Sequence, residues 1–83
     1  MIIEVCGPDC PRCQATERKV LQALKELRME LGEEVQVIEI KDVKQISARG
    51  VIMTPAVIID GVKVSEGRIP SHQEVRKWIE EKK

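Results

Sequence analysis

Cysteine is the residue type with the clearest chemical signal in this chain. The three cysteines, Cys6, Cys10 and Cys13, fall within eight consecutive residues. An odd number of cysteines cannot pair completely, and a local cluster cannot cross-link distant segments, so a structural disulfide framework is excluded. Because Cys10 and Cys13 form a Cys-x-x-Cys sequence, they can close a disulfide and reopen it. The cluster therefore predicts chemistry rather than cross-linking.

The place of this pair in the chain favours disulfide exchange. It follows a short apolar stretch, and Pro11 suits the first turn of a helix. At the N-terminus of a helix, unpaired backbone N–H groups and the macrodipole stabilise a thiolate. We therefore expect Cys10 to have a lowered pKa, assisted by Arg12, and to attack disulfides. Cys13, one turn further into the helix, is expected to be the resolving thiol.

Thr54-Pro55 is the second signal. The proline precedes an apolar stretch, and proline cannot donate to a sheet ladder, so it marks the first residue of a strand or a special peptide bond. A peptide bond before proline adopts the cis form at a cost of only about 0.5–1 kcal/mol. In a chain that also carries Cys-x-x-Cys, we predict a cis bond that presents the backbone of Thr54 to whatever the cysteine loop holds.

Cys6 supports a different function. Three clustered thiolates can bind zinc, copper or an iron–sulfur cluster, so a soft-metal or iron–sulfur protein using Cys6, Cys10 and Cys13 is the alternative. A structural zinc site needs four ligands, however, and the one histidine, His72, lies far along the chain. Cys6 also ends a predicted strand, where a small buried core residue is typical. No metal site is therefore assigned.

The elements that must position these residues follow from the apolar pattern. Val and Ile, which favour strands, concentrate in residues 2–6, 35–40, 56–59 and 62–64, whereas all the Leu residues lie within 21–31. The helical spacing of the Leu residues predicts a long helix.

The predicted ends of the helices depend on capping residues. The long helix is expected to begin at Pro11 and end at Gly32. A short helix is bounded by Asp42 and Gly50, and Ser71 with Glu74 forms a capping box that begins the last helix.

The predicted order of elements is βαβαββα. The strand–helix–strand unit implies a right-handed crossover with parallel pairing, whereas Asp60-Gly61 between two strands predicts an antiparallel hairpin. The chain is therefore predicted to be an α/β protein with a four-stranded mixed sheet covered by helices.

Length and charge narrow the function classes. Eighty-three residues suit one domain, 1–83, with a single core. A formal net charge of zero argues against a polybasic surface for nucleic acid. There is no apolar run of membrane-spanning length, and the first residues lack the pattern of a secretory signal. A soluble cytoplasmic protein, bound to neither nucleic acid nor membrane, is expected.

With these motifs together, the chain resembles the small redox-active disulfide proteins of the thioredoxin fold, the glutaredoxin-sized relatives found in archaea and bacteria. The resemblance rests on residues 7–13, 50–61 and 67–71. It implies a minimal thioredoxin fold with strand order 2-1-3-4. It also implies that the first and third helices lie on one face of the sheet and the second on the other.

The resemblance also implies a function and a site. Cys10 would attack disulfides, Cys13 would resolve the mixed disulfide, and Pro11, Arg12, Thr54 and Pro55 would contact the substrate. The expected protein is a monomeric thiol–disulfide oxidoreductase that acts on protein disulfides and is re-reduced by a reductase of the thioredoxin-reductase type. Because the dithiol itself carries the electrons, no bound cofactor is expected.

Overall fold

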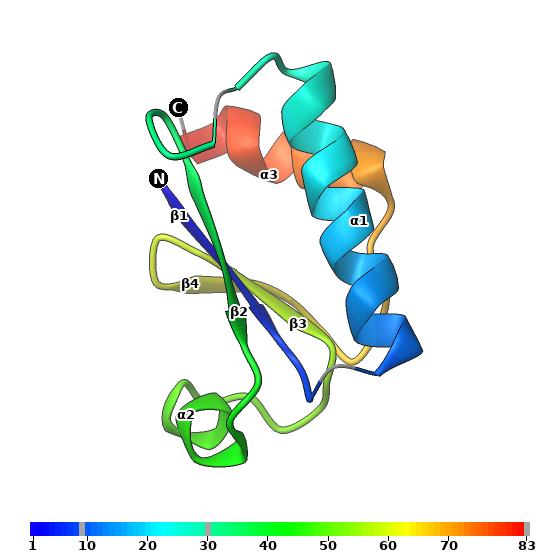
Figure 1. Ribbon diagram of the computed structural model, residues 1–83, viewed down its shortest axis with the longest axis vertical. Helices are drawn as coiled ribbons and strands as arrows, with labels where there is room; N and C mark the ends of the chain where they lie inside the picture. Colours follow the sequence, from blue (N-terminus) through cyan, green and yellow to red (C-terminus); the bar gives the residue numbers. More distant parts are fainter. Residues whose placement is uncertain (9, 30, 83) are drawn as a thin grey trace.

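The elements and their order match the predicted pattern (Figure 1). The computed structural model describes residues 1–8, 10–29 and 31–82. In this part of the chain, the elements are β1 (Ile2–Cys6), α1 (Pro11–Glu26), β2 (Gln36–Ile40), α2 (Val43–Ala48), β3 (Ala56–Ile59), β4 (Val62–Glu66) and α3 (His72–Lys82). None of these helices has the length and apolar character that a membrane span requires.

The strands form one four-stranded sheet in the order β2-β1-β3-β4, which confirms the expected order. β1 and β2 are parallel, whereas β3 is antiparallel to both β1 and β4. Parallel pairing places the carboxyl ends of β1 and β2 at the same edge, which is where the chain leaves β1 toward Cys10.

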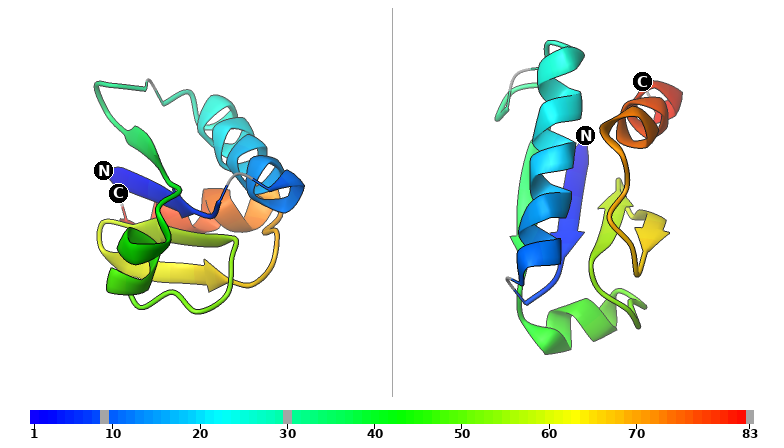
Figure 2. Two further views of the ribbon diagram at one scale, coloured as in Figure 1. Left: turned by 60° about the horizontal axis from the view of Figure 1, so that its bottom comes forward. Right: turned by 90° about the vertical axis from the view of Figure 1, so that its right-hand side faces the viewer.

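The two faces of the sheet are covered by different helices, as expected (Figure 2). Side chains alternate along a strand, so Ile3 and Val5 of β1 lie in a core cluster with α1 and α3. Cys6, on the opposite face, lies in a second cluster with Ile46 of α2 and Ile58 of β3. The alternation therefore separates Cys6 from the face that α1 covers.

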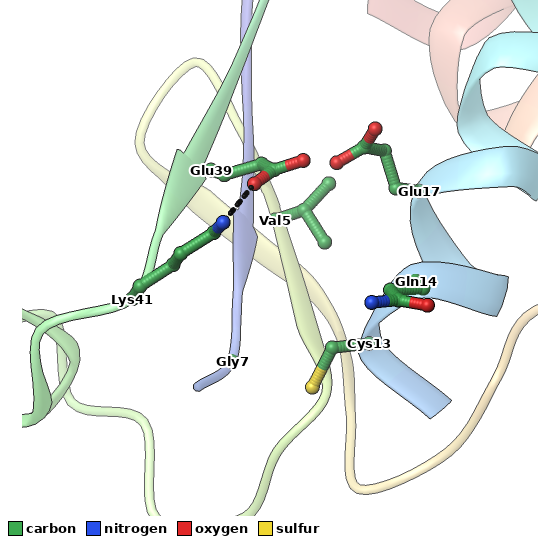
Figure 3. A pocket seen from close by; sticks show the side chains of 7 residues that line it. All are labelled: Val5, Gly7, Cys13, Gln14, Glu17, Glu39 and Lys41. Atoms are coloured by element: carbon green, nitrogen blue, oxygen red, sulfur yellow. Dashed lines mark ion pairs between the residues drawn. The ribbon is translucent and has the colours of Figure 1, made fainter. Parts of the chain in front are cut away.

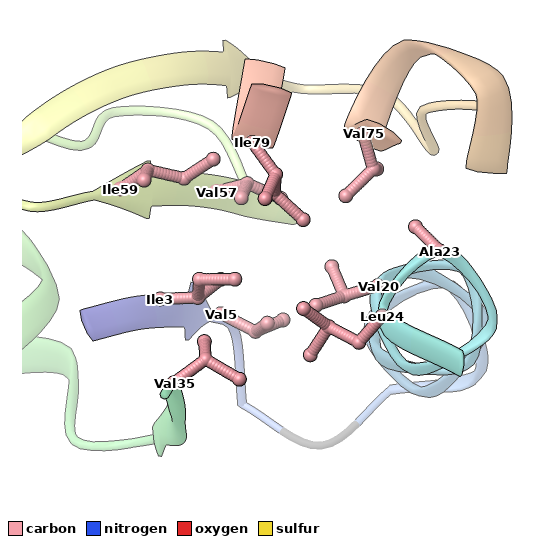
Figure 4. Close-up of a cluster of buried hydrophobic side chains, with 10 residues drawn as sticks. All are labelled: Ile3, Val5, Val20, Ala23, Leu24, Val35, Val57, Ile59, Val75 and Ile79. Carbon is pink, nitrogen blue, oxygen red and sulfur yellow. The ribbon is translucent and has the colours of Figure 1, made fainter. Parts of the chain in front are cut away.

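The larger cluster holds α1 against the sheet. Figure 4 shows its buried aliphatic side chains, namely Ile3, Val5, Val20, Ala23, Leu24, Val35, Val57, Ile59, Val75 and Ile79. Burying one Val, Leu or Ile side chain stabilises a fold by about 1.5–3 kcal/mol. This packing fixes the axis of α1, and with it the position of the two cysteines at its N-terminus.

The end of α1 differs from the sequence-based expectation. The helix covers Pro11–Glu26 rather than continuing to Gly32. Arg28 adopts the left-handed conformation, with φ 56°, and the N–H of Met29 donates to the carbonyl of Leu24 at 3.0 Å. These features form a Schellman motif, in which glycine is the usual residue at the left-handed position. Met29 packs against the core, and this contact stabilises the turn that ends the helix before Gly32.

The other local predictions are largely confirmed. Asp60 and Gly61 both have positive φ, 48° and 84°, as a two-residue hairpin turn requires. Asp42 caps α2, but the C-cap is Arg49, and Gly50 follows it with φ 76°. The predicted C-cap of α2 was therefore wrong by one residue.

The predicted capping box of α3 is present. The N–H of Glu74 donates to Ser71 Oγ at 3.1 Å, and the N–H of Ser71 donates to Glu74 Oε1 at 3.1 Å. Arg68 also donates to both carboxylate oxygens of Glu74. The Arg68 bonds first, and then the Ser71 N–H, lower the pKa of Glu74 to about 2, so this cap stays ionised in the neutral range.

Candidate active site

The connection from β1 to α1 brings the two thiols of Cys-x-x-Cys together. Cys10 is the N-cap of α1, with an extended backbone, and its Sγ accepts the N–H of Cys13 at 3.3 Å. The two Sγ atoms lie 2.7 Å apart, with both cysteines as free thiols. Cys13 is only 5% exposed, whereas Cys10 is partly exposed. A substrate can therefore reach Cys10 more easily than Cys13.

Hydrogen bonds lower the pKa of the Cys10 thiol. The largest contribution is the hydrogen bond with the Cys13 thiol, followed by the backbone N–H of Cys13, while partial burial acts in the opposite direction. Arg12 contributes through its backbone N–H. Its guanidinium, from which the sequence predicted electrostatic help, donates instead to the carbonyl of Gly67 at 3.0 Å. The lowered pKa therefore comes first from the neighbouring Cys13 thiol and then from the backbone N–H groups that Cys10 meets as the N-cap of α1.

Gly7 makes room for the buried thiol. A Cβ on Gly7 would overlap Cys13 Sγ and would lie 3.0 Å from Cys13 Cβ and 3.8 Å from Thr54 Cβ. The side chain of Cys13 therefore packs against the backbone of Gly7, and Thr54 lies near the same glycine. The sequence analysis missed this role, although a glycine between the end of a strand and a cysteine pair is the available signal.

The segment that ends at Pro55 lies beside the cysteines and is linked to them through the turn after β4. The Thr54–Pro55 peptide bond is cis, as predicted. The carbonyl of Pro55 accepts the N–H of Gly67 at 2.9 Å, and the carbonyl of Gly67 accepts Arg12. Pro55 is fully buried, whereas Pro11 is exposed. The structure therefore gathers Cys10, Cys13, Arg12, Thr54 and Pro55 in one region.

A small pocket of about 10 Å³ lies beside Cys13, between the start of α1 and the end of β2 (Figure 3). Cys13 and Val5 line it together with Glu17, Glu39 and Lys41, and the last two form an ion pair at 3.0 Å. Charged groups thus line the space beside the Cys13 thiol. The motifs in the sequence did not point to Glu17, nor to Glu39 and Lys41 at the end of β2. The parallel pairing of β1 with β2 was the signal for them.

Cys6 does not join this site. It is 0% exposed and packs in the cluster on the α2 face of the sheet. Burial, followed by the nearby charge of Glu4, raises the pKa of its thiol. Among the described residues, no group of three His, Cys, Asp or Glu side chains is placed to hold a metal ion. The geometry therefore gives no support to the three-cysteine metal site.

Comparison with known proteins identifies the family. A family described as "Thioredoxin domain" matches residues 1–80. A curated thioredoxin from Methanocaldococcus jannaschii is 36% identical over 79 residues, covering 95% of this chain and 86% of that protein. A curated thioredoxin from Methanothermobacter thermautotrophicus is 32% identical over 79 residues, covering 95% of this chain and 97% of that protein. With its vicinal thiols at the start of α1, the chain belongs to the thioredoxin-domain family.

Proposed function

We propose that Cys10 is the nucleophile and Cys13 the resolving thiol with which this protein reduces protein disulfides. The protein is a thiol–disulfide oxidoreductase, as its thioredoxin relatives indicate. The observation that carries the assignment of residues is the 2.7 Å separation of the two Sγ atoms at the N-terminus of α1. The difference in exposure between the two thiols supports the order of their roles.

The reaction has two exchange steps. The Cys10 thiolate attacks one sulfur of the substrate disulfide, which forms a mixed disulfide and releases the other substrate sulfur as a thiolate. Cys13 then loses its proton and attacks Cys10 Sγ. This step forms the Cys10–Cys13 disulfide and releases the second substrate sulfur. Two electrons have passed from the dithiol to the substrate, and a reductase returns them.

The substrate side of the proposal rests on the segment that leads into Thr54. Ile52 and Met53 are 90% and 61% exposed, directly before Thr54. Exposed apolar side chains in this segment suit a protein substrate, which can bury them on binding. We include Thr54 and Pro55 among the substrate-binding residues. Thr54 is partly exposed, and the buried Pro55 contributes by fixing the backbone of Thr54.

The two residues between the cysteines complete this set. Pro11 contributes an exposed ring next to Cys10, and Arg12 contributes through its bond to the turn after β4.

The proposal also covers the state and location of the protein. Residues 1–83 are treated as one domain that acts as a monomer, because both thiols and the segment beside them come from one chain. The reductant is a reductase of the thioredoxin-reductase type. The cytoplasm is the proposed compartment, because protein thiols are kept reduced there.

Turnover of a protein disulfide tests the function. The reduced protein is expected to accelerate the reduction of insulin disulfides by dithiothreitol, and a variant with both Cys10 and Cys13 replaced by Ser is expected to leave the uncatalysed rate. The assay follows precipitation of the freed insulin chain. Equal rates with the wild-type protein and with the double variant would contradict the proposal.

Thiol labelling distinguishes Cys6 from the redox pair. In the native reduced protein, iodoacetamide is expected to label Cys10 at a pH below the ordinary thiol range, because the pKa of Cys10 is lowered. Cys6 is expected to stay unlabelled until the protein unfolds, since it is buried and its pKa is raised. Mass spectrometry of digested protein reads out both sites.

A Cys6→Ala variant is the matched control for turnover. It is expected to keep turnover within about twofold of the wild type, because the exchange mechanism needs two thiols. Loss of nearly all turnover in a folded Cys6→Ala protein would return the three-cysteine site to consideration.

A further inference from the structure

We infer that Glu66 is a positioning residue that sets the affinity for protein disulfides by holding the backbone of Ile52 and Met53, the two residues that lead into Thr54. This inference rests on the proposed function, and it adds to it a residue at the end of β4, outside both sequence motifs.

Glu66 uses its two carboxylate oxygens for different partners. Oε2 accepts the N–H of Ile52 at 2.6 Å and the N–H of Met53 at 3.1 Å. Oε1 forms an ion pair with Lys63 Nζ at 2.8 Å. One oxygen therefore holds two successive backbone donors, and the other is held by a lysine on the same strand.

The segment before Thr54 has little side-chain packing to fix it. Ile52 and Met53 are largely exposed, so burial of their side chains does not determine their conformation. Met53 does lie over Gly67, where an added Cβ would be 3.3 Å from Met53 Cβ. Hydrogen bonds to a carboxylate are stronger than those between neutral groups, and two of them converge here. Glu66 thus holds the backbone N–H groups of residues 52 and 53, while Lys63 Nζ donates to the carbonyl of Gly50 at the start of the segment.

The segment continues directly into the site. Thr54 follows Met53, and a Cβ added to Gly7 would contact both Thr54 and Cys13. Gly67, the residue after Glu66, donates to the Pro55 carbonyl and accepts Arg12 from the Cys-x-x-Cys sequence. Residues 66 and 67 therefore tie the segment before Pro55 to the start of α1. A substrate backbone that binds beside Cys10 meets a surface whose orientation Glu66 sets.

The carboxylate stays available throughout the pH range of the reaction. Its hydrogen bond with Lys63, and then the Ile52 and Met53 N–H groups, lower the pKa of Glu66 to about 2. Thiol–disulfide exchange requires a thiolate and takes place far above that pH. The positioning contact is therefore permanent and does not switch with pH.

A matched pair of Glu66 variants separates the effect of side-chain length from the effect of the carboxylate charge. In Glu66→Gln, the side-chain carbonyl can occupy the place of Oε2 and accept both N–H groups, although the ion pair with Lys63 is lost. Glu66→Asp keeps the charge but is one methylene shorter, so it cannot reach both amides. Lys63→Gln is a further control. It removes the ion pair with Glu66 and the hydrogen bond from Lys63 Nζ to the carbonyl of Gly50, and it leaves the carboxylate acceptor in place.

Steady-state kinetics with insulin as the protein disulfide provide the test. For Glu66→Asp, KM is expected to rise about tenfold with little change in kcat, a size that corresponds to the loss of about one charge-assisted hydrogen bond. Glu66→Gln and Lys63→Gln are expected to stay within about twofold of the wild-type KM. The rate with a small aromatic disulfide, which reports the thiols alone, is expected to be unchanged in all three variants.

Two results would overturn the inference: an unchanged KM in Glu66→Asp, or an equal rise in Glu66→Gln, which would assign the effect to charge. Amide hydrogen exchange of the wild-type protein is an independent check that needs no variant. The N–H groups of Ile52 and Met53 are expected to exchange at least about tenfold more slowly than in an unstructured chain, and unprotected amides would contradict the inference. Failure of the proposed function looks different, because the wild-type protein itself would then show no insulin turnover.

Discussion

A Cys13→Ser variant is expected to accumulate covalent complexes with substrate proteins, whereas a Cys10→Ser variant is not. Cys10 is the partly exposed N-cap of α1, and its pKa is lowered by hydrogen bonds from Cys13. It is therefore placed to attack first. Without the second thiol, the mixed disulfide has no partner within the protein to resolve it, so the complex persists. Both variants are expected to lose turnover, down to near the uncatalysed rate.

Non-reducing gels measure this directly. The Cys13→Ser protein, incubated with an oxidised protein substrate, is expected to give a new band that disappears on reduction. Cys10→Ser is the matched control, because it also keeps one thiol of the pair. That thiol is Cys13, which is only 5% exposed. Equal trapping by both variants would remove the assigned order, and trapping by Cys10→Ser alone would reverse it.

Replacement of Cys13 by Ser has one side effect to separate from the chemistry. The hydrogen bond between the two side chains is the largest cause of the lowered Cys10 pKa. A hydroxyl can still donate at this position, so Cys13→Ser is a better choice than Cys13→Ala for retaining the reactivity of Cys10. Alkylation of Cys10 in the variant, measured against pH, shows how much of the lowered pKa remains.

The sequence predicts the features of this protein that depend on local physics. The capping position of Cys10 follows from Pro11 and from the unpaired N–H groups of a helix N-terminus, which need no knowledge of the rest of the chain. The separation of Cys6 from the site follows from strand alternation. The hairpin at Asp60-Gly61 follows from a turn that needs two positive φ values.

Features that depend on tertiary contacts were missed. The end of α1 was placed at Gly32 because glycine favours the left-handed conformation, but Arg28 adopts it instead, stabilised by hydrogen bonds and by Met29 packed on the core. Leu31 has helical spacing in the sequence, yet it lies outside the helix and is 56% exposed. Periodicity alone cannot show where packing ends a helix.

The same distinction holds within the site. The sequence identified both cysteines and the Thr54-Pro55 pair from their motifs, and the structure brings them together. It did not identify Glu66, because a carboxylate at the end of a strand has no motif and its role comes from two amides 13 and 14 residues away. Contacts of this kind become visible only when the register between β3 and β4 is known.

A Gly7→Ala variant is expected to be destabilised by about 1–3 kcal/mol and to resolve mixed disulfides slowly. The added Cβ would overlap Cys13 Sγ and lie 3.0 Å from Cys13 Cβ, and forcing extra atoms into a packed site has this cost. Gly7 is not among the residues with positive φ, so the backbone accepts alanine and the cost comes from space alone. To relieve the overlap, the Cys13 thiol must move from its position beside Cys10.

A double-mutant cycle isolates this contact. The free energy of unfolding is measured in urea for the reduced forms of the wild type, Gly7→Ala, Cys13→Ala and the double variant. Because Cys13→Ala removes the overlapping sulfur, Gly7→Ala is expected to cost at least about 1 kcal/mol less in that background. In the background with both cysteines, Gly7→Ala is expected to leave a weaker form of the mixed-disulfide band seen with Cys13→Ser, since a displaced thiol resolves the intermediate slowly. An equal cost of Gly7→Ala in both backgrounds would show that Cys13 Sγ does not pack against Gly7. The close contact between Gly7 and the Cys13 thiol would then be contradicted.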